Sequence, residues 1–258
     1  TLTLAEAFWP GPLTIVLPKK DCVPDVVTSG LATVAVRSPS HPVFREILRL
    51  VGAPLAAPSA NLFGKVSPTR AKHVMESFGQ DHPPVLDGGP TEVGIESTVL
   101  DLTEPRLKIL RPGPITREDL VGVIGGEQVT YDSSVNPSGK DRPSSPGLIP
   151  HHYQPDSPLM TFPNPQALGS FIKENIDLPK GTIILTHSMN DTLDPLPHGT
   201  NTLHLSESGN PEEIARNLFG CLRHADRKSP PLLLCSLLTE KGIGRAINDR
   251  LRRAAGKC

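Results

Sequence analysis

The chain has 258 residues, of which 37% are hydrophobic and 21% charged, so it is long enough for two domains or one large one. Its formal net charge of −1 provides no overall attraction to nucleic acid or to a membrane surface. Nothing approaches the roughly 18 uninterrupted apolar residues that a membrane-spanning helix requires, which predicts a protein without a membrane partner. The low aromatic content, 4%, disfavours an RNA-binding surface based on base stacking.

Short apolar strands alternate with amphipathic helices from Leu4 to about Gly125. Runs rich in β-branched residues and bounded by proline or glycine predict strands, and apolar spacings of three and four residues predict helices. The expected strands are 13–17, 32–36, 54–57, 85–87, 97–102 and 107–110, and the expected helices are 41–51, 68–78 and 115–124. Pro68 should occupy the first turn of its helix and Thr116 the N-cap of the last one.

A proline-, serine- and glycine-rich stretch without apolar periodicity then separates this first α/β domain from a second alternation of strands and helices. The second half should form strands at 159–162, 182–186, 202–205 and 232–237, with helices at 166–176, 211–224 and 241–255. This order predicts a small parallel, Rossmann-like sheet. We therefore expect a first domain at 1–125, a linker at 126–157 and a second domain at 158–258.

The four cysteines, Cys22, Cys221, Cys235 and Cys258, show no spacing typical of a metal site or a redox motif. Cys235 lies within an apolar run, which predicts a buried thiol. A reduced, cytoplasmic chain is the simplest interpretation. The chain starts without methionine and without a signal-like segment, so its first residue need not be where the gene starts.

Two groups of polar residues follow predicted strands in the first half. Ser59 and Asn61 come directly after the apolar segment that ends at Ala57, where open α/β sheets bind ligands, although both residue types are also common in turns. Thr33 and Arg37 share one face of a strand because side chains alternate with a period of two. Arg37 can therefore bind a carboxylate or a phosphate, or form an ordinary salt bridge.

Two further groups follow later in the same domain. A glycine-rich stretch at 87–96 precedes Ser97 and Thr98, whose hydroxyls can bind a polar substrate, or the stretch is simply a turn between strands. Arg111 ends a predicted strand before Pro112 and Gly113, where an arginine either clamps phosphate or lies on the surface.

Adjacent histidines occupy positions 151 and 152 of the linker, next to Tyr153. They lack neighbours with metal-ligand spacing, so we favour a linker that folds over a site and expect no protein-held metal. The stretch at 242–244 lacks the third glycine of a dinucleotide fingerprint, and the chain contains neither a GxSxG elbow nor a Walker A sequence. The sequence therefore excludes a standard α/β-hydrolase and a P-loop NTPase.

In this order the motifs resemble the YrdC/Sua5 family. The segments that carry the resemblance are FWPGPLT (8–14), TVAVR (33–37), APSAN (57–61), STV (97–99), LRPG (110–113) and SPGLIPHHYQP (145–155). The linker and the second α/β domain resemble the two-domain Sua5 branch, and the similarity covers nearly the whole chain. The resemblance implies a YrdC-like twisted mixed sheet with helices and a smaller Rossmann-like domain. It also implies an N-terminally incomplete first domain, because the family's Lys-x-Arg segment precedes the part matched here.

The resemblance further implies an L-threonylcarbamoyladenylate synthase, a nucleotidyltransferase that converts L-threonine, bicarbonate and ATP to threonylcarbamoyl-AMP and pyrophosphate. Its product supplies the threonylcarbamoyl group of a modified tRNA adenosine. Carried over residue by residue, the resemblance implies that L-threonine contacts Arg37, Ala57 and Ser97. By the same comparison ATP, accompanied by Mg²⁺, contacts Thr33, Ser59, Asn61, Ser67, Arg111 and Tyr153.

Such a reaction depends on positioning and charge neutralisation more than on a covalent nucleophile, which agrees with a site of hydroxyls, an amide and arginines. A linker that excludes water would protect the labile carbamate. The expected protein partner is the tRNA-modification machinery, and double-stranded RNA is a further expected partner. Two alternatives remain at this point: an RNA-binding or regulatory YrdC-like module without synthase activity, and a carbamoyl-transfer enzyme with a different acceptor amine.

Overall fold

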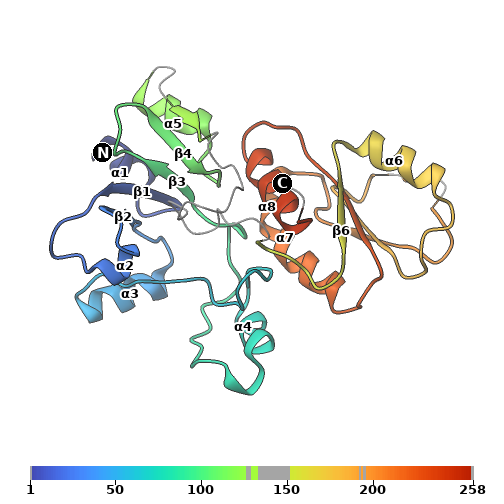
Figure 1. Ribbon diagram of the computed structural model, residues 1–258, viewed down its shortest axis with the longest axis horizontal. Coiled ribbons are helices and arrows are strands. Elements are labelled where there is room, and N and C mark those ends of the chain that lie inside the picture. The colour runs from blue at the N-terminus through green and yellow to red at the C-terminus, as the bar shows by residue number, and fades with distance from the viewer. Residues whose placement is uncertain (1, 126–128, 133–151, 192, 194–195, 257–258) are drawn as a thin grey trace. The chain divides into compact units, whose positions relative to one another are not determined.

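The computed structural model describes residues 2–125, 129–132, 152–191, 193 and 196–256 (Figure 1). The chain divides into two compact units. Unit 1 consists of the described residues of Thr1–Pro58 and Glu96–Ile149, and unit 2 of those of Ser59–Ile95 and Pro150–Cys258. Among the described residues, no helix is both long and apolar enough to cross a membrane.

Unit 1 contains a mixed five-stranded sheet with the order β2-β1-β3-β4-β5. The strands are β1 (Leu13–Pro18), β2 (Thr33–Val36), β3 (Thr98–Asp101), β4 (Leu107–Arg111) and β5 (Val129–Tyr131). β1 pairs antiparallel with β2 and parallel with β3, while β3 pairs antiparallel with β4 and β4 parallel with β5. The expected mixed sheet is therefore confirmed.

One face of this sheet is covered by α1 (Leu2–Phe8) and α5 (Arg117–Ile124), which bury Leu4 and Leu120 against Leu13 and Ile15 of β1. Because side chains alternate along a strand, Thr14 and Val16 lie on the opposite face. There Val16 packs with Val99 and Leu110 in a much smaller apolar cluster. The sheet thus has one helix-covered face and one face with room for polar chemistry.

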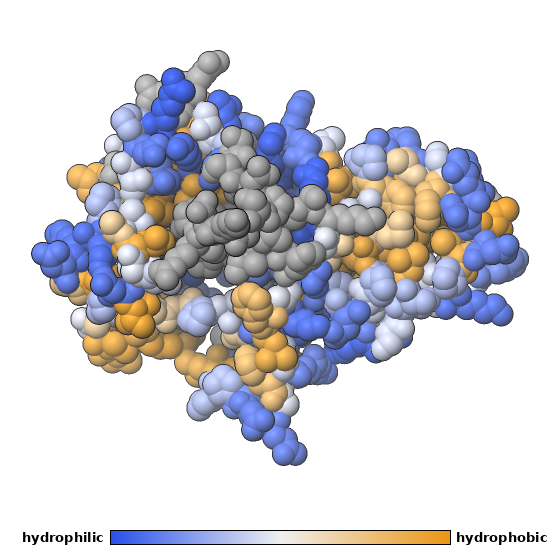
Figure 2. Space-filling view, in the orientation of Figure 1, coloured by the Kyte–Doolittle hydropathy of each residue, from blue (hydrophilic) through white to orange (hydrophobic). Residues whose placement is uncertain are grey.

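Helices α2 (Asp25–Thr28) and α3 (Pro42–Val51) lie near the edge strand β2 and bury little apolar surface. No residue of α3 is buried, although its apolar residues lie on one side as the sequence predicts. Val26 of α2 is 87% exposed and Leu50 of α3 is 70% exposed. Figure 2 shows orange, apolar areas over this part of unit 1.

Helix α5 begins at a complete capping box, as the sequence predicts for Thr116. The Thr116 hydroxyl accepts a hydrogen bond from the Asp119 N–H, and the Asp119 carboxylate accepts one from the Thr116 N–H at 2.8 Å. We expect Thr116→Ala to lower the free energy of unfolding by about 1 kcal/mol, because the helix loses this cap. Urea unfolding of the variant and of Thr91→Ala, at an exposed threonine outside the helices, would test this, and equal midpoints would contradict it.

Unit 2 contains an all-parallel four-stranded sheet with the order β6-β9-β7-β8, which confirms the Rossmann-like expectation. Its strands are β6 (Leu159–Phe162), β7 (Ile183–Thr186), β8 (Asn201–His204) and β9 (Leu233–Ser236). Helices α7 (Pro211–Asp226) and α8 (Gly244–Ala254) pack with one face of the sheet, and α6 (Pro165–Glu174) packs with the other. Cys235 is buried as expected, and burial raises the pKa of its thiol to about 12.

Residues 59–95, which include α4 (Ala71–Phe78) and the 3₁₀ turn η1 (Gly79–Asp81), pack with unit 2. The expected helix 68–78 begins three residues late. Thr69 does not start it because its carbonyl accepts a hydrogen bond from the Thr91 N–H. The strands expected at 54–57 and 85–87 are wrong, since both segments are largely exposed and pair with no neighbouring strand.

Candidate active site

Three polar side chains meet on the open face of the unit 1 sheet. The hydroxyls of Thr14 in β1 and Ser97, which precedes β3, lie 2.7 Å apart. Arg111 at the end of β4 donates from Nε to the Ser97 carbonyl and from Nη2 to the Ser97 hydroxyl, both at 3.1 Å. Ser97 and Arg111 are only 4% and 9% exposed. The cluster therefore combines two hydroxyls with a mostly buried guanidinium.

An irregularity in the sheet places Arg111 in this cluster. Val99 pairs with Arg111 while the next residue, Leu100, pairs with Ile109, so Leu110 is an extra residue in β4. A one-residue shift moves the following side chain to the other face of a sheet. Ile109 packs on the helix-covered face, and the bulge brings Arg111 to the open face beside Ser97. Sequence reasoning identified Arg111 but had no signal for the bulge.

The turn after Arg111 is packed directly against the start of β3. The Thr98 hydroxyl donates to the Ile115 carbonyl at 2.6 Å, which ties β3 to the entrance of α5. A Cβ atom at Gly113 would lie 2.3 Å from the Thr98 nitrogen and 2.7 Å from the carbonyl carbon of Ser97. Only glycine fits this close approach of two backbone segments.

The other residues predicted in unit 1 lie at its edge. Thr33 begins β2, and Arg37 follows the end of that strand with a side chain that remains accessible. Desolvation by the surrounding protein lowers the pKa of Arg37, which still carries its charge at neutral pH. Ala57 lies on an exposed segment without regular structure. Of the five residues predicted here, Ser97 and Arg111 are joined by hydrogen bonds.

In unit 2, the Ser-x-Asn motif forms a tight turn held by Asn61. Its amide nitrogen donates to the carbonyls of Leu62 at 2.8 Å and Lys65 at 3.1 Å. The Asn61 Oδ1 atom is buried and has no hydrogen-bond partner within the described part of the chain. Buried acceptors are normally satisfied, so this oxygen is available to a ligand. Ser59 is exposed before this turn, and Ser67 is buried after it.

Tyr153 lies at the described end of the linker and is fully buried in unit 2. Its ring stacks on Phe219 of α7 with centroids 5.2 Å apart, and the Arg250 guanidinium lies 5.8 Å from its centroid. Tyr153 has a φ angle of 67°, which is uncommon for a residue other than glycine. Residues 145–151 of the SPGLIPHHYQP motif lie outside the described residues.

Comparison with known proteins identifies the family. Residues 1–113 match the Sua5–YciO–YrdC family model, described as telomere recombination, and residues 115–256 match the C-terminal domain of threonylcarbamoyl-AMP synthase. The threonylcarbamoyl-AMP synthase of Pyrococcus abyssi is 39% identical over 98% of this chain and 73% of its own length. The chain belongs to the threonylcarbamoyl-AMP synthase family.

Other relatives agree with this assignment. The threonylcarbamoyl-AMP synthase of Bacillus subtilis is 36% identical over 98% of this chain and 72% of its own length. The crystal structure of P. abyssi Sua5 complexed with L-threonine has a TM-score of 0.86 at 38% identity, over 99% of this chain and 73% of that one. The resemblance to the two-domain Sua5 branch is confirmed, and with it the class of a nucleotidyltransferase in the threonylcarbamoyladenosine modification of tRNA.

One residue of the cluster around Ser97 and Arg111 was not among the predicted site residues, although it lies in a motif that carries the family resemblance. Thr14 ends the FWPGPLT segment, and its hydroxyl contacts that of Ser97. The only sequence signal was a polar residue at an alternating position of an apolar strand. Among the described residues, no three His, Cys, Asp or Glu side chains gather in a group that could hold a metal ion.

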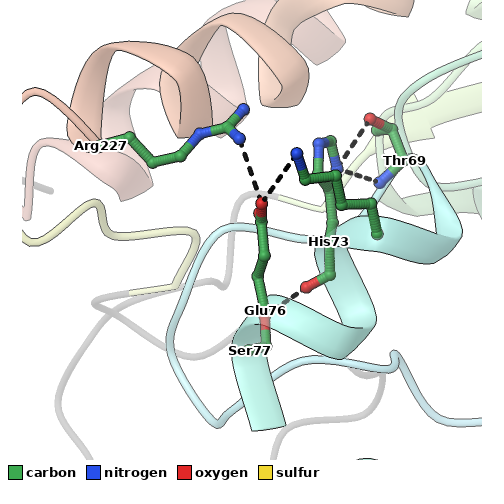
Figure 3. A network of polar contacts seen from close by, with 6 residues as sticks. Thr69, His73, Glu76, Ser77 and Arg227 are labelled. Atoms are coloured by element: carbon green, nitrogen blue, oxygen red, sulfur yellow. Dashed lines mark hydrogen bonds and ion pairs between the residues drawn. The ribbon is translucent and has the colours of Figure 1, made fainter. Parts of the chain in front are cut away.

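A histidine outside the predicted set is buried on α4. His73 of α4 accepts a hydrogen bond at Nδ1 from the Thr69 N–H at 3.1 Å (Figure 3). Burial is the largest cause that lowers the pKa of the imidazole, and the Arg223 charge lowers it further, while Glu76 raises it. The folded protein therefore favours neutral His73.

This preference predicts a pH dependence of stability. Because the pKa of His73 is lower in the folded than in the unfolded chain, its contribution is present above the ordinary histidine pKa of about 6.5 and decreases as pH falls below it. We expect the urea midpoint to fall less between pH 7.5 and 5.5 in His73→Asn, which keeps an acceptor near Thr69 but cannot titrate. A wild-type slope equal to that of the variant would contradict this.

Proposed function

We propose that this chain forms threonylcarbamoyl-AMP and pyrophosphate from L-threonine, bicarbonate and ATP. The observation that carries this is the buried contact of Arg111 with Ser97 beside Thr14. The resemblance assigns Ser97 to threonine and Arg111 to ATP. The carbamate of threonine must meet the α-phosphate of ATP, so a threonine-binding residue and an ATP-binding residue should be neighbours at that point.

The reaction has two bond-forming steps. The threonine amine attacks the carbon of bicarbonate and gives a carbamate with release of water. A carbamate oxygen then attacks the α-phosphorus, and the bond from that phosphorus to the departing pyrophosphate oxygen breaks. Charge accumulates on phosphate oxygens, and fixed cations and hydroxyl donors stabilise it without a covalent intermediate. Arg111 supplies such a cation, and Thr14 and Ser97 supply hydroxyls.

The remaining assignments follow the resemblance. Arg37 and Ala57 contact L-threonine together with Ser97, while ATP contacts Thr33, Ser59, Asn61, Ser67 and Tyr153 together with Arg111. The buried Asn61 Oδ1, without a partner in the described part of the chain, supports a polar ligand at the Ser-x-Asn turn. Mg²⁺ arrives as the chelate of ATP, since this ion is usually bound through substrate phosphates and water. The functional division is 1–125, 126–157 and 158–258, and the product passes to the tRNA-modification machinery of the cytoplasm.

Pyrophosphate release from ATP tests the activity. We expect release that requires both L-threonine and bicarbonate, together with a product of the mass of threonylcarbamoyl-AMP. Release that requires bicarbonate and proceeds when a different amine replaces threonine would favour another acceptor amine. A folded protein that binds RNA and releases no pyrophosphate would instead support the RNA-binding module.

Arg37→Ala tests the threonine assignment. We expect the KM for L-threonine to rise by about 10- to 100-fold, because the substrate carboxylate loses its cation, while the KM for ATP changes less than about twofold. Steady-state kinetics with each substrate varied in turn would measure both values. Arg45→Ala, an exposed arginine of α3, is the matched control. Equal losses for both substrates would contradict the assignment.

A further inference from the structure

Helix α7 in the second half of the chain holds the loop that contains Ser67. Arg223 of α7 donates from Nη2 to the Val66 carbonyl at 2.5 Å and from Nε to the Ser67 carbonyl at 3.3 Å. The same Nη2 atom also donates to the Ser77 hydroxyl of α4 at 3.1 Å. One guanidinium therefore fixes two consecutive peptide groups of the loop, and a planar group with several donors suits this role.

The same helix also holds the chain where it leaves the linker. Asp226, one turn beyond Arg223, accepts hydrogen bonds from the backbone N–H groups of Asp156 and Ser157, both at 2.8 Å. The loop and this linker end are joined as well, because the Gln154 N–H donates to the Gly64 carbonyl at 2.8 Å and Lys65 forms an ion pair with Asp156. A cation and a carboxylate on one helix thus hold two segments that also contact each other.

Residues 92–94 of the same segment also lie against α7. Arg216 donates from Nε to the Glu92 carbonyl at 2.9 Å. A Cβ atom at Gly94 would lie 2.4 Å from the Arg216 Cα atom, so the backbone of this segment rests directly on the helix. The segment 59–95 contains only the short helix α4 and the turn η1 as regular structure. Contacts with α7 therefore position the loop.

We propose that Arg223 and Asp226 are positioning residues for nucleotide binding. They hold the loop 64–67 and the linker end against α7. This proposal rests on the proposed function, in which Asn61 and Ser67 contact ATP. Asn61 donates to the Lys65 carbonyl, and Arg223 holds the two carbonyls that follow. The direction of the Ser67 side chain and the Ser-x-Asn turn therefore depend on a guanidinium from the C-terminal domain, which gives that domain a role in the reaction.

Arg223→Met tests this proposal in the full chain. It keeps the apolar stem and removes every donor, so we expect the Kd for a non-hydrolysable ATP analogue to rise about 10-fold, the scale of one lost charge-assisted hydrogen bond. We expect the KM for L-threonine to change less than about twofold. Arg227→Met is the matched control, because Arg227 directly follows the same helix as its C-cap residue and pairs only with Glu76 among the contacts shown in Figure 3. It should bind the analogue as the wild type does.

The outcomes separate the two proposals. Failure of the wild type to bind the analogue would overturn the proposed function. Normal binding by the wild type and unchanged binding by Arg223→Met would overturn the positioning role alone, as would equal losses for the analogue and threonine. If Arg223→Met does not fold by circular dichroism, Arg223→Lys and Asp226→Asn provide the test. Each retains part of the contact and should weaken analogue binding about threefold at an unchanged melting temperature, and unchanged binding by both would overturn the role.

Discussion

Arg111→Met is expected to lower kcat/KM for pyrophosphate release by at least about 100-fold, the scale of removing one donor that stabilises charge in a transition state. The guanidinium is mostly buried and lies 3.1 Å from the Ser97 hydroxyl, so water cannot replace it easily. Methionine has a similar length and no charge, which leaves the phosphates without this cation. Initial rates at saturating bicarbonate, with threonine and ATP varied, would measure the loss.

Two variants separate charge from geometry at this position. Arg111→Lys keeps the charge but cannot donate to the Ser97 carbonyl and hydroxyl together, so it should recover only part of the activity. Arg106→Met removes an exposed arginine from the turn between β3 and β4 and should be as active as the wild type. Full activity in Arg111→Met would show that Arg111 has only a structural role in the sheet.

Gly113→Ala should reduce both activity and stability. The added Cβ would lie 2.3 Å from the Thr98 nitrogen, and the backbone at Ser97 and Thr98 must move to admit it. We expect a loss of about 1–3 kcal/mol in the free energy of unfolding, which is typical of overpacking. Displacement of Ser97 from Arg111 should also lower kcat about 10-fold or more, since small errors of position are costly in catalysis. Urea unfolding and pyrophosphate release would measure the two effects.

The matched control for this variant is Gly122→Ala. Gly122 lies inside α5, and its added Cβ would meet no atom within 4 Å. Alanine is favoured over glycine in a helix by about 1 kcal/mol, so this variant should be slightly more stable and fully active. A Gly113→Ala protein as stable and active as this control would contradict the close approach of the two segments.

Local patterns in the sequence predicted most of the regular structure. β-branched runs such as 13–17 form strands, and Thr116 forms the expected N-cap, because both depend on neighbouring residues. The segments 54–57 and 85–87 have strand-like composition but find no partner strand, and pairing is a property of the fold rather than of the segment. The short elements α1, α2 and β5 were not predicted, because short segments carry too little periodicity.

The sequence predicted which residues belong to the candidate site but not how their side chains contact one another. Ser97 and Arg111 were identified separately, and their contact depends on the extra residue in β4. Asn61 was identified from its motif, whereas its buried oxygen without a partner in the described part could be seen only in the structure. The hydrogen bond from Arg223 to the Val66 carbonyl joins residues 157 positions apart, and no local sequence pattern indicates such a contact.

The extra residue Leu110 also determines how this sequence can be aligned with others. The turn that joins β3 to β4 can gain or lose residues without altering which way Arg111 points, because the pairing of Leu100 with Ile109 resets the register. If β4 paired at the same length without this bulge, Arg111 would share the face of Ile109 and point into the hydrophobic core beneath α1 and α5. Deletion of Leu110 itself restores plain alternation and leaves the arginine opposite Val99 on the open face. A one-residue gap at position 110 of an alignment is therefore compatible with an arginine that stays in the site, as is a gap in the turn.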